Sequence, residues 1–413
     1  MPLLISCQEV QPGMRLAEAF MWKGRMMLPG GKVLVRDDVD VLRRKYAEVM
    51  LKIGDPILDS LAKFEDDGKE REVANTVQQA VSQSLSKVQE RLTSHSSFAK
   101  LDFNAVRNSV GSVIEYLKGN PVSAALLTRN GDAANYLTDH AGAVFYLCMV
   151  LGSAVRDYVV TERTRQTAAS NLSSHIAMDL LPLGLGAMFM DLGMFPLKHL
   201  FAEGYELTAE DRQAIREHPV VGAEQLPETL PAGVKMIVRT HHENMDSSGY
   251  PAAMRGESLH IFTRIIRICD AFEAATAKSV YKQAKSPARV IWEMCAGPYR
   301  KCYDPVLMKV FRSLIQPFPI GAKLRLVDGR TAVVVRYNRK EPFRPTVIVA
   351  FDERGERLPN DQIPSPVSVG EDNPLRLATF AGEDLTYIYD LPLQESSEKV
   401  GPSLISLLDT AYP

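Results

Sequence analysis

Apolar positions recur at intervals of three and four residues from residue 73 onward, which is the spacing of an amphipathic helix. The first such stripe comprises Val73, Val77, Ala80, Val81, Leu85, Val88 and Leu92. It predicts a helix that either packs on its own domain, the favoured alternative, or forms a homodimer contact through residues 73–92. The same spacing dominates residues 100–316, where strand signals are few, so we expect a mainly α, helical domain there.

A different pattern precedes this helical region. Residues 1–60 combine short apolar runs with Gln-Pro-Gly and Leu-Pro-Gly-Gly turn signals. They predict a small N-terminal module, β-rich or α+β, that contains a helix from Asp37 to Met50. Residues 61–99 are strongly charged at their start and then helical, so we interpret them as a linker and a connecting helix.

The pattern changes again after residue 316. An Asp-Gly turn at 328–329 separates two apolar runs, and a third run follows at 346–351. This arrangement is typical of a β-hairpin with a further strand. We therefore expect a small C-terminal β-barrel-like module at 317–372. Residues 373–413 are dotted with proline and serine, and we expect them to form an irregular tail.

Composition narrows the class of protein. The 413 residues, 46% hydrophobic and 24% charged, are ordinary for a soluble globular chain of two or three domains. A formal net charge of −2 gives no electrostatic support for DNA binding or for attachment to a membrane surface. Five cysteines form no Cys-x-x-Cys pair, which favours reduced thiols over a disulfide framework or a zinc knuckle.

Targeting signals are also weak. The first residues lack the basic start of a signal peptide. No run approaches the roughly 18 uninterrupted apolar residues of a membrane span. The best candidate, Ile176 to Phe195, is interrupted by Asp179, Pro182 and Asp191. We therefore expect a cytoplasmic protein with no membrane insertion.

The most patterned stretch of the chain is His-His-Glu-Asn-Met-Asp-Ser-Ser-Gly-Tyr-Pro at 241–251. Imidazoles and carboxylates together are the usual ligands of catalytic first-row metals. A Gly-Tyr-Pro turn beside them is suited to shaping a substrate pocket. This run makes a metal-dependent reaction the first hypothesis.

Further histidines and aspartates lie on helical faces that are otherwise apolar. They are His140, Asp191, His218 and Asp270. We expect His218 to end a helix that Thr208 caps and Pro219 stops. A buried carboxylate is costly unless it is paired or bound to a metal. Any one of these residues alone is more often a hydrogen-bonded core residue, but together with His241 and His242 they favour a metal centre. The remaining histidines are interpreted as surface or local structure: His95, His175, His199 and His260.

These residues carry a family resemblance. The chain resembles HD-GYP proteins, a branch of the HD phosphohydrolase superfamily, over roughly residues 100–350. The segments that match are 135–140, 186–194, 207–211, 217–222, 241–251 and 265–281, and most specifically 241–251. The resemblance implies an HD-type helical bundle with two metal ions, iron or manganese. It also implies hydrolysis of cyclic di-GMP, a bacterial signalling nucleotide, to pGpG or GMP by a metal-bound hydroxide.

The resemblance also implies roles for individual residues. The metal ligands would be His140, Asp191, His218, His241, His242 and Asp270. Asp191 would bridge two ions and position the hydroxide. The substrate would contact Gly249, Tyr250, Pro251 and Tyr281. Glu243 and Asp246 would orient the imidazoles through hydrogen bonds.

The chain departs from the family pattern at four positions. Met190 replaces the histidine of the central His-Asp pair, and a thioether is a poor ligand for hard divalent iron or manganese. Met194 replaces a lysine, Ser247 a glycine and Ser279 an arginine. One metal position keeps its full ligand set, whereas the other keeps only three ligands. The chain would thus hold two ions, or one if Met190 costs a position.

Three functional hypotheses follow. The first is an active metal-dependent phosphodiesterase on cyclic di-GMP. The second is a catalytically weakened or inactive HD-GYP module that binds cyclic di-GMP or a protein partner in signalling. The third is an HD-type hydrolase of another phosphoester. The retained ligands favour the first hypothesis, and the substitutions at Met190, Met194 and Ser279 favour the second.

Overall fold

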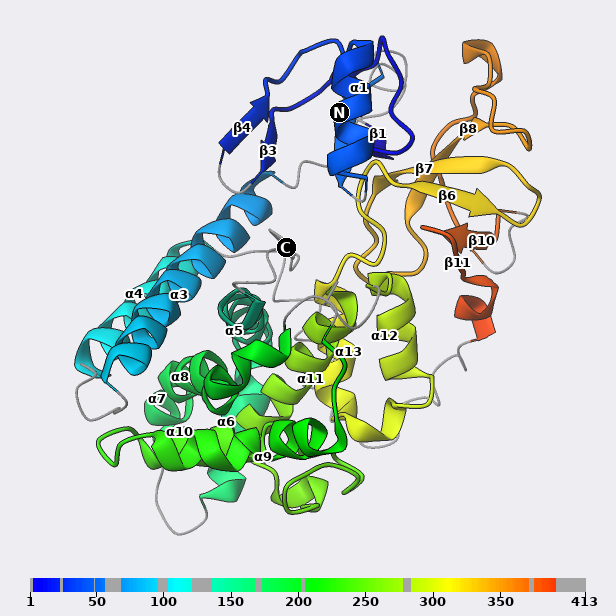
Figure 1. Ribbon diagram of the computed structural model, residues 1–413. Helices are drawn as coiled ribbons and strands as arrows, with labels where there is room; N and C mark the ends of the chain where they lie inside the picture. Colours follow the sequence, from blue (N-terminus) through cyan, green and yellow to red (C-terminus); the bar gives the residue numbers. More distant parts are fainter. Residues whose placement is uncertain are drawn as a thin grey trace. The chain divides into compact units, whose positions relative to one another are not determined.

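The computed structural model shows helices and two groups of strands (Figure 1). The residues that it describes are 3–22, 25–47, 49–55, 68–95, 103–120, 136–167, 173–201, 205–277, 284–370 and 375–390. The chain divides into two compact units. The first consists of Met1–Gly68, Ser286–Arg289 and Ile315–Tyr389, and the second of Lys69–Lys285, Val290–Leu314 and Asp390–Pro413. We describe each unit by itself.

The N-terminal part of the first unit is a small α+β arrangement, as predicted. Its strands are β1 (Leu3–Ser6), β2 (Arg15–Leu16), β3 (Phe20–Trp22), β4 (Arg25–Leu28) and β5 (Met50–Gly54). A three-stranded sheet has the order β1-β5-β2, and β3 pairs with β4. Strands β1 and β5 are antiparallel, with Leu3 opposite Ile53. Both side chains are buried on one face of this sheet.

The predicted helix from Asp37 to Met50 is too long. Helix α1 spans Arg36–Lys45, with acidic residues in its first turn and basic residues in its last, which suits the helix dipole. The chain then turns and enters β5, where Leu51 and Ile53 are buried and their neighbours are not. This alternation has the period of a strand. The helix therefore ends earlier than the apolar residues up to Met50 suggested.

The second sheet of this unit confirms the predicted hairpin. Its strands are β6 (Lys323–Leu326), β7 (Thr331–Arg336), β8 (Thr346–Phe351), β9 (Val367–Ser368), β10 (Leu377–Phe380) and β11 (Glu383–Asp384). Strands β6 and β7 pair antiparallel across the Asp328-Gly329 turn. Gly329 has a φ of 89°, a left-handed conformation that favours glycine. The order is β11-β10-β6-β7-β8-β9, with β11 and β9 at the ends of the order. This sheet is the predicted small C-terminal β module.

The segment after residue 373 is more ordered than expected. Strand β10 pairs with β6, and the 3-10 helix η7 (Thr386–Asp390) follows. Leu377, Leu385 and Ile388 are buried, which anchors this stretch to the sheet. The prediction of an irregular tail from 373 is therefore wrong for residues 377–390, and residues 391–413 lie outside the described part of the chain.

The N-terminal strands and the six-stranded sheet of the first unit share one hydrophobic core. Leu16 and Ile53 from the N-terminal segment belong to the same buried cluster as Val333 and Ile348 from the second sheet. The backbone N–H of Leu4 donates to the carbonyl oxygen of Gly321 at 2.9 Å. Segments that the sequence suggested as separate modules at 1–60 and 317–372 thus pack as a single unit.

The second unit is helical. Its helices are α3 (Gly68–His95), α4 (Phe103–Gly119), α5 (Tyr136–Ala154), α6 (Arg156–Gln166), α7 (Ser174–Ala177), α8 (Leu181–Phe189), η3 (Leu192–Phe201), α9 (Ala209–Gln225), α10 (Ala232–Thr240), η4 (Gly256–Ser258), α11 (Ile261–Thr276), α12 (Pro287–Cys295), η5 (Arg300–Cys302) and α13 (Pro305–Leu314). Helix α5 is buried along almost its whole length and packs against α8, α11 and α13. Helix α9 packs against η3 and α10 (Figure 1). The predicted HD-type helical bundle corresponds to these helices.

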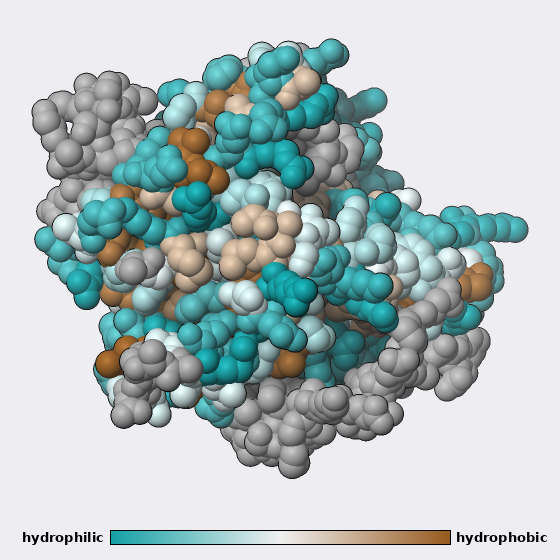
Figure 2. All heavy atoms as spheres, turned by 90° about the horizontal axis from the view of Figure 1, so that it is seen from below, coloured by the Kyte–Doolittle hydropathy of each residue, from teal (hydrophilic) through white to brown (hydrophobic). Residues whose placement is uncertain are grey.

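Two stretches, Tyr136–Ala154 and Ser174–Leu200, are long and apolar enough by composition to cross a membrane. Within the fold they are 83% and 72% buried, respectively. The face seen in Figure 2 is mostly hydrophilic, with hydrophobic side chains in small separate groups. These stretches therefore act as core elements of the helical unit.

The long helix α3 packs on its own unit. Val73, Val77 and Val81 are buried within the single chain. Ser82 Oγ donates to the carboxylate of Asp139 on α5 at 2.9 Å. This burial favours the own-domain alternative over a dimer contact for the part of α3 whose side chains are described.

Helix α9 runs further than predicted. Thr208 caps its N-terminus as expected, because its side-chain oxygen accepts from the backbone N–H of Asp211. The helix then continues through His218 and Pro219 to Gln225. The prediction that Pro219 stops the helix is wrong. His218 therefore lies in the interior of the helix rather than at its end.

We predict that Gly142→Ala destabilises the protein by about 1–3 kcal/mol, because there is no room for the added methyl group. A Cβ at Gly142 of α5 would lie 2.8 Å from the carbonyl oxygen of Gln78 in α3. Gly111→Ala in α4 is the matched control, since a Cβ there meets no atom within 4 Å. The control should stabilise by roughly 0.5–1 kcal/mol through helix propensity. Denaturant unfolding measures both, and equal effects would contradict the close packing of α3 on α5.

Candidate metal centre

Five segments of the helical unit bring the predicted ligands together. His140 lies on α5, His218 on α9 and Asp270 on α11. Asp191 follows α8, and His241 with His242 follows α10. One ring nitrogen from each of His218, His241 and His242 lies within 4.8 Å of the others. Asp191, His140 and Asp270 lie beside them. The six residues expected to be ligands are therefore neighbours in space although they come from distant parts of the sequence.

Two of the imidazoles are oriented by the backbone. His218 Nδ1 contacts the carbonyl oxygen of Ile215 at 2.5 Å, and His241 Nδ1 contacts that of Val238 at 2.7 Å. A carbonyl oxygen only accepts, so each Nδ1 is the donor and each Nε2 carries a lone pair in the neutral ring. Burial lowers the pKa of His241 to about 4, which keeps that ring neutral near pH 7.

These ring nitrogens point at other acceptors. The Nε2 atoms of His218 and His241 are 3.1 Å apart. Asp191 Oδ1 lies 3.2 Å from His218 Nε2. Such a group of lone pairs is unfavourable unless a proton or a cation lies among them. Neutral nitrogen and anionic oxygen donors so close together fit a first-row divalent metal.

His140 forms the second half of the centre. Its Nε2 lies 3.2 Å from Asp270 Oδ1 and 3.4 Å from Asp191 Oδ2. Asp191 thus faces His218 with one oxygen and His140 with the other, the arrangement required of a bridging carboxylate. His242 completes the group, with Nδ1 3.6 Å from Asp270 Oδ2.

The centre is buried, and its acids are ionised. Burial alone would raise the pKa of Asp191, but the neighbouring histidines, His218 first, hold it at about 2. The pKa of Asp270 also lies well below its usual value, because the contact with His140 and the proximity of His242 and Arg267 outweigh burial. Burial and the neighbouring His241 lower the pKa of His242. The result is anionic oxygens beside the neutral rings of His241 and His242.

Glu273 is a residue that sequence reasoning missed. Its carboxylate contacts His140 Nδ1, and its side chain is only 1% exposed. It therefore does for His140 what the backbone carbonyls do for His218 and His241, leaving Nε2 turned toward the aspartates. The available signal was an acid three residues after Asp270 on the same apolar helix, α11.

Glu243 has a different role from the one expected. It is fully buried, and its two carboxylate oxygens accept from the backbone N–H groups of Ala252 and Met254 at 2.7 and 3.0 Å. The expectation that it orients an imidazole is therefore replaced by a role in holding the Gly-Tyr-Pro loop. A buried carboxylate can satisfy two backbone donors at once, which a short loop needs when its own backbone cannot pair.

Asp246 likewise serves the loop. Its Oδ1 accepts from the backbone N–H and hydroxyl of Ser248 at 3.1 and 2.6 Å. Cys302 Sγ lies 3.9 Å from Asp246 Oδ2, and the backbone N–H of Met245 donates to Cys302 O at 3.0 Å. These contacts fix the loop locally and give Asp246 other partners than the imidazoles.

The loop needs its glycine. A Cβ at Gly249 would lie 2.4 Å from the backbone nitrogen of Asn244 and 2.5 Å from the carbonyl oxygen of His242. The Tyr250-Pro251 peptide bond is cis. The Tyr250 ring stacks on His242, with centroids 4.7 Å apart. Gly249 and Tyr250 therefore adjoin His242, one of the expected metal ligands, whereas Pro251 is exposed and Tyr281 lies outside the described residues.

A second glycine brings two ligands together. A Cβ at Gly193 would lie 2.2 Å from the carbonyl oxygen of His218. The backbone of η3 can thus contact α9 directly, two residues after Asp191. Asp191 lies just before this contact in the chain, and the backbone of His218 forms the other side of it. The absence of a side chain at Gly193 therefore allows Asp191 and His218 to lie close together.

The departures from the family pattern occupy distinct environments. Met190 is fully buried at the end of α8, and Met194 is 6% exposed. Neither thioether is therefore a solvent-facing group. Ser247 has a φ of 64°, a left-handed conformation in which the expected glycine would be unstrained. Ser279 lies outside the described residues.

The chain is similar to known proteins over part of its length. Residues 160–307 match the family model described as an HD domain. The chain is 28% identical over 176 residues to a cyclic di-GMP phosphodiesterase of Pseudomonas aeruginosa, covering 42% of each protein. It is 26% identical over 229 residues to a cyclic di-GMP phosphodiesterase of Thermotoga maritima, covering 51% of this chain and 58% of that protein.

Other similarities are shorter or weaker. A phosphodiesterase of Vibrio cholerae named as specific for 3'3'-cGAMP is 32% identical over 108 residues, covering 25% of this chain and 20% of that protein. A solved structure of an HDG"Y"P protein from Bdellovibrio bacteriovorus aligns with a TM-score of 0.39 and 13% identity, over 74% of this chain and 96% of that one. We draw no argument from an alignment at that score.

The helical unit therefore contains an HD domain. The similar phosphodiesterases fit the HD-GYP resemblance that the sequence indicated. The matched segments span less than two thirds of the length of these phosphodiesterases.

We predict that the protein, once stripped by a chelator, binds Mn(II) or Co(II), and that His241→Ala weakens this binding at least about tenfold. The reason is that the change removes one nitrogen from the acceptor group. Calorimetry and the visible spectrum of the Co(II) form report binding without any assay of activity. His175→Ala is the control, because His175 is exposed on α7. Equal losses in both variants, or no binding by the unmodified protein, would refute the assignment.

Proposed function

We propose that the protein is a metal-dependent phosphodiesterase that hydrolyses cyclic di-GMP to pGpG or GMP. The observation that carries the proposal is the position of Asp191, whose two oxygens face His218 at 3.2 Å and His140 at 3.4 Å. The names of the similar phosphodiesterases support the substrate class. Iron and manganese suit the mixed nitrogen and oxygen donors best.

The centre would hold one or two ions through the six residues named above, with Asp191 shared. A bound divalent ion lowers the pKa of a coordinated water and stabilises charge on phosphoryl oxygens, which is what phosphodiester hydrolysis near pH 7 requires. The chain itself lowers the pKa of His241 by burial, orients His140, His218 and His241 through their Nδ1 atoms, and excludes solvent from His241.

Two arginines lie close to residues of the candidate metal centre. Arg216 of α9 lies over the Tyr250 ring at 4.6 Å, and that ring stacks on His242. Arg267 of α11 has Nη1 3.9 Å from Asp270 Oδ2 and donates from Nε to Asn244 Oδ1 at 2.8 Å. We propose that these guanidiniums supply the cationic contacts that Met194 and Ser279 do not. Tyr250 would offer its ring to a guanine base.

A weakened or inactive module that binds cyclic di-GMP, or a signalling protein, is the second candidate. The observation that favours it is Met190, a fully buried thioether at the position of an expected imidazole, directly before Asp191. Met190 would leave the His140 side of the centre with fewer ligands and a weaker hold on its ion. Binding of cyclic di-GMP without turnover would favour this candidate.

We predict that the protein loaded with Mn(II) or Fe(II) under anaerobic conditions converts cyclic di-GMP to pGpG or GMP. Asp191→Ala should reduce product formation to the uncatalysed background, because Asp191 contacts both halves of the centre. Chromatography of the products measures turnover.

The matched control for that assay is Asp157→Ala, which removes an exposed acid of α6. It should retain the full rate. Product formation that is the same in the Asp191 variant as in the unmodified protein would refute the enzyme hypothesis, and so would its absence from both. Tight binding of cyclic di-GMP in that second case would support the receptor module.

We predict that Arg216→Gln and Arg267→Gln each raise KM for cyclic di-GMP about tenfold or more, since each removes a charge-assisted hydrogen bond to phosphate. The value of kcat should change much less. Arg239→Gln on the exposed face of α10 is the matched control and should leave both constants unchanged. A fall in kcat with no change in KM would show that the arginines act on the metal ligands instead.

A further inference from the structure

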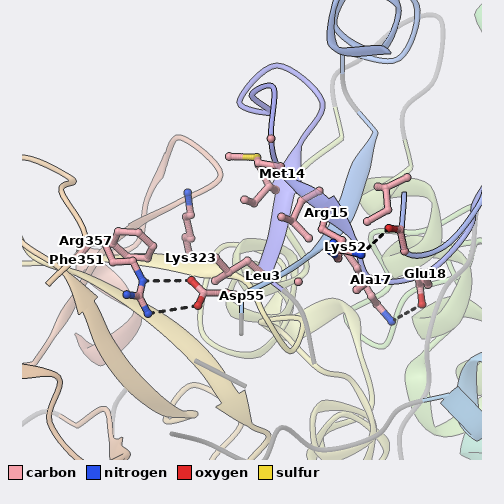
Figure 3. Close-up of a pocket in the computed structure, with 16 residues that line it drawn as sticks. Leu3, Met14, Arg15, Ala17, Glu18, Lys52, Asp55, Lys323, Phe351 and Arg357 are labelled. Atoms are coloured by element: carbon pink, nitrogen blue, oxygen red, sulfur yellow. Dashed lines mark hydrogen bonds and ion pairs between the residues drawn. The ribbon is translucent and has the colours of Figure 1, made fainter. Parts of the chain in front are cut away.

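The first unit contains a cavity of about 840 Å3, and none of the residues that line it was used in the site described above (Figure 3). This volume lies in the range of small-molecule sites, which is roughly 300–1,000 Å3. The cavity is lined by residues of the N-terminal segment, by Lys323 of β6 and Phe351 of β8, and by Arg357, which follows β8. It therefore occurs where the N-terminal strands and the six-stranded sheet share their core.

The floor of the cavity is apolar. Leu3, Ile5 and Ile53 are each no more than 6% exposed, and they belong to the common core of the unit. Phe351 is partly buried and packs against the same core. A ligand that used this floor would gain by removing apolar surface from water.

Two ion pairs flank the floor on opposite sides of the cavity (Figure 3). Arg357 donates from Nε and Nη2 to the Asp55 carboxylate at 3.2 and 3.3 Å. Lys52 Nζ lies 3.2 Å from Glu18 Oε2. Each pair compensates its own charge, so neither requires a charged ligand.

The lining holds two further cations, Arg15 and Lys323, so its four cationic side chains exceed its two acids. Arg15 Nη1 donates to the carbonyl oxygen of Gly31 at 3.1 Å, a neutral acceptor. Lys323 Nζ is 3.5 Å from Glu9, whose side chain is 60% exposed, and 5.2 Å from the centre of the Phe351 ring. An exposed pair at that distance is weak. Positive charge thus lies beside an apolar floor and an aromatic face.

We infer that this cavity is a binding site for a small organic anion with an apolar or aromatic body. The body lies on Leu3, Ile53 and Phe351, and the anionic group interacts with Arg15 and Lys323. Charge complementarity excludes a cationic ligand, and the apolar floor disfavours a bare inorganic anion. The site is independent of the metal centre and of the function proposed for it.

The test uses the full chain and two fluorescent probes with one ring system. Anilinonaphthalene sulfonate carries the anionic group, whereas N-phenylnaphthylamine is neutral. We expect saturable binding of the sulfonate that weakens with added salt, because screening acts on the charge. Arg15→Gln and Lys323→Gln should each weaken it by about three- to tenfold, the range for an exposed charge-assisted contact. The neutral probe should bind more weakly and respond to neither variant.

Arg44→Gln on the exposed side of α1 is the charge-matched control and should bind the sulfonate like the unmodified protein. Circular dichroism establishes that each variant is folded. No binding of the sulfonate, or equal binding of both probes with no effect of Arg15→Gln and Lys323→Gln, would overturn the inference. It would also be overturned if Arg216→Gln and Arg267→Gln abolished binding while the cavity variants did not, because the probe would then occupy the helical unit.

Discussion

The helical unit contains one electrostatic constraint on which the candidate site depends. Several hydrogen-bond acceptors lie close together, and they face mainly one another. His218 and His241 give their Nδ1 protons to backbone carbonyls, so their Nε2 lone pairs meet each other and Asp191. His140 repeats the arrangement with Glu273 in place of a carbonyl. Positive charge placed inside such a cluster would compensate it. In the proposed metal centre, folding and metal binding would therefore be coupled.

Much of the candidate site was predictable from sequence. His140, Asp191 and Asp270 are polar residues on apolar helical faces, and each must find a partner in the interior. The His-His pair lies directly beside a glycine-containing turn. These local signals are strong because burying a charge is costly, so a chain tolerates it only where something compensates. The hairpin around Gly329 was predictable for a similar reason, since its turn needs a positive φ.

The partners of those residues were harder to predict. Glu243 reads as one more acid of the motif, yet it holds the backbone of Ala252 and Met254. Which donor a buried carboxylate meets depends on the path of the loop, and single-sequence patterns do not contain that path. The common core of residues near 16–53 and 333–350 has the same cause. The sequence pattern of each segment indicates which of its side chains are buried. It does not indicate that the other segment is the surface against which they pack.

That shared core has a consequence for how the chain is made. Leu16 and Ile53 leave the ribosome early, whereas Val333 and Ile348, against which they pack, leave it some three hundred residues later. The whole helical segment from 69 to 285 is synthesised in between. The N-terminal segment is thus translated before the helical unit, but its core is completed only after that unit. Until then its apolar face is uncovered, a condition that favours association with other chains.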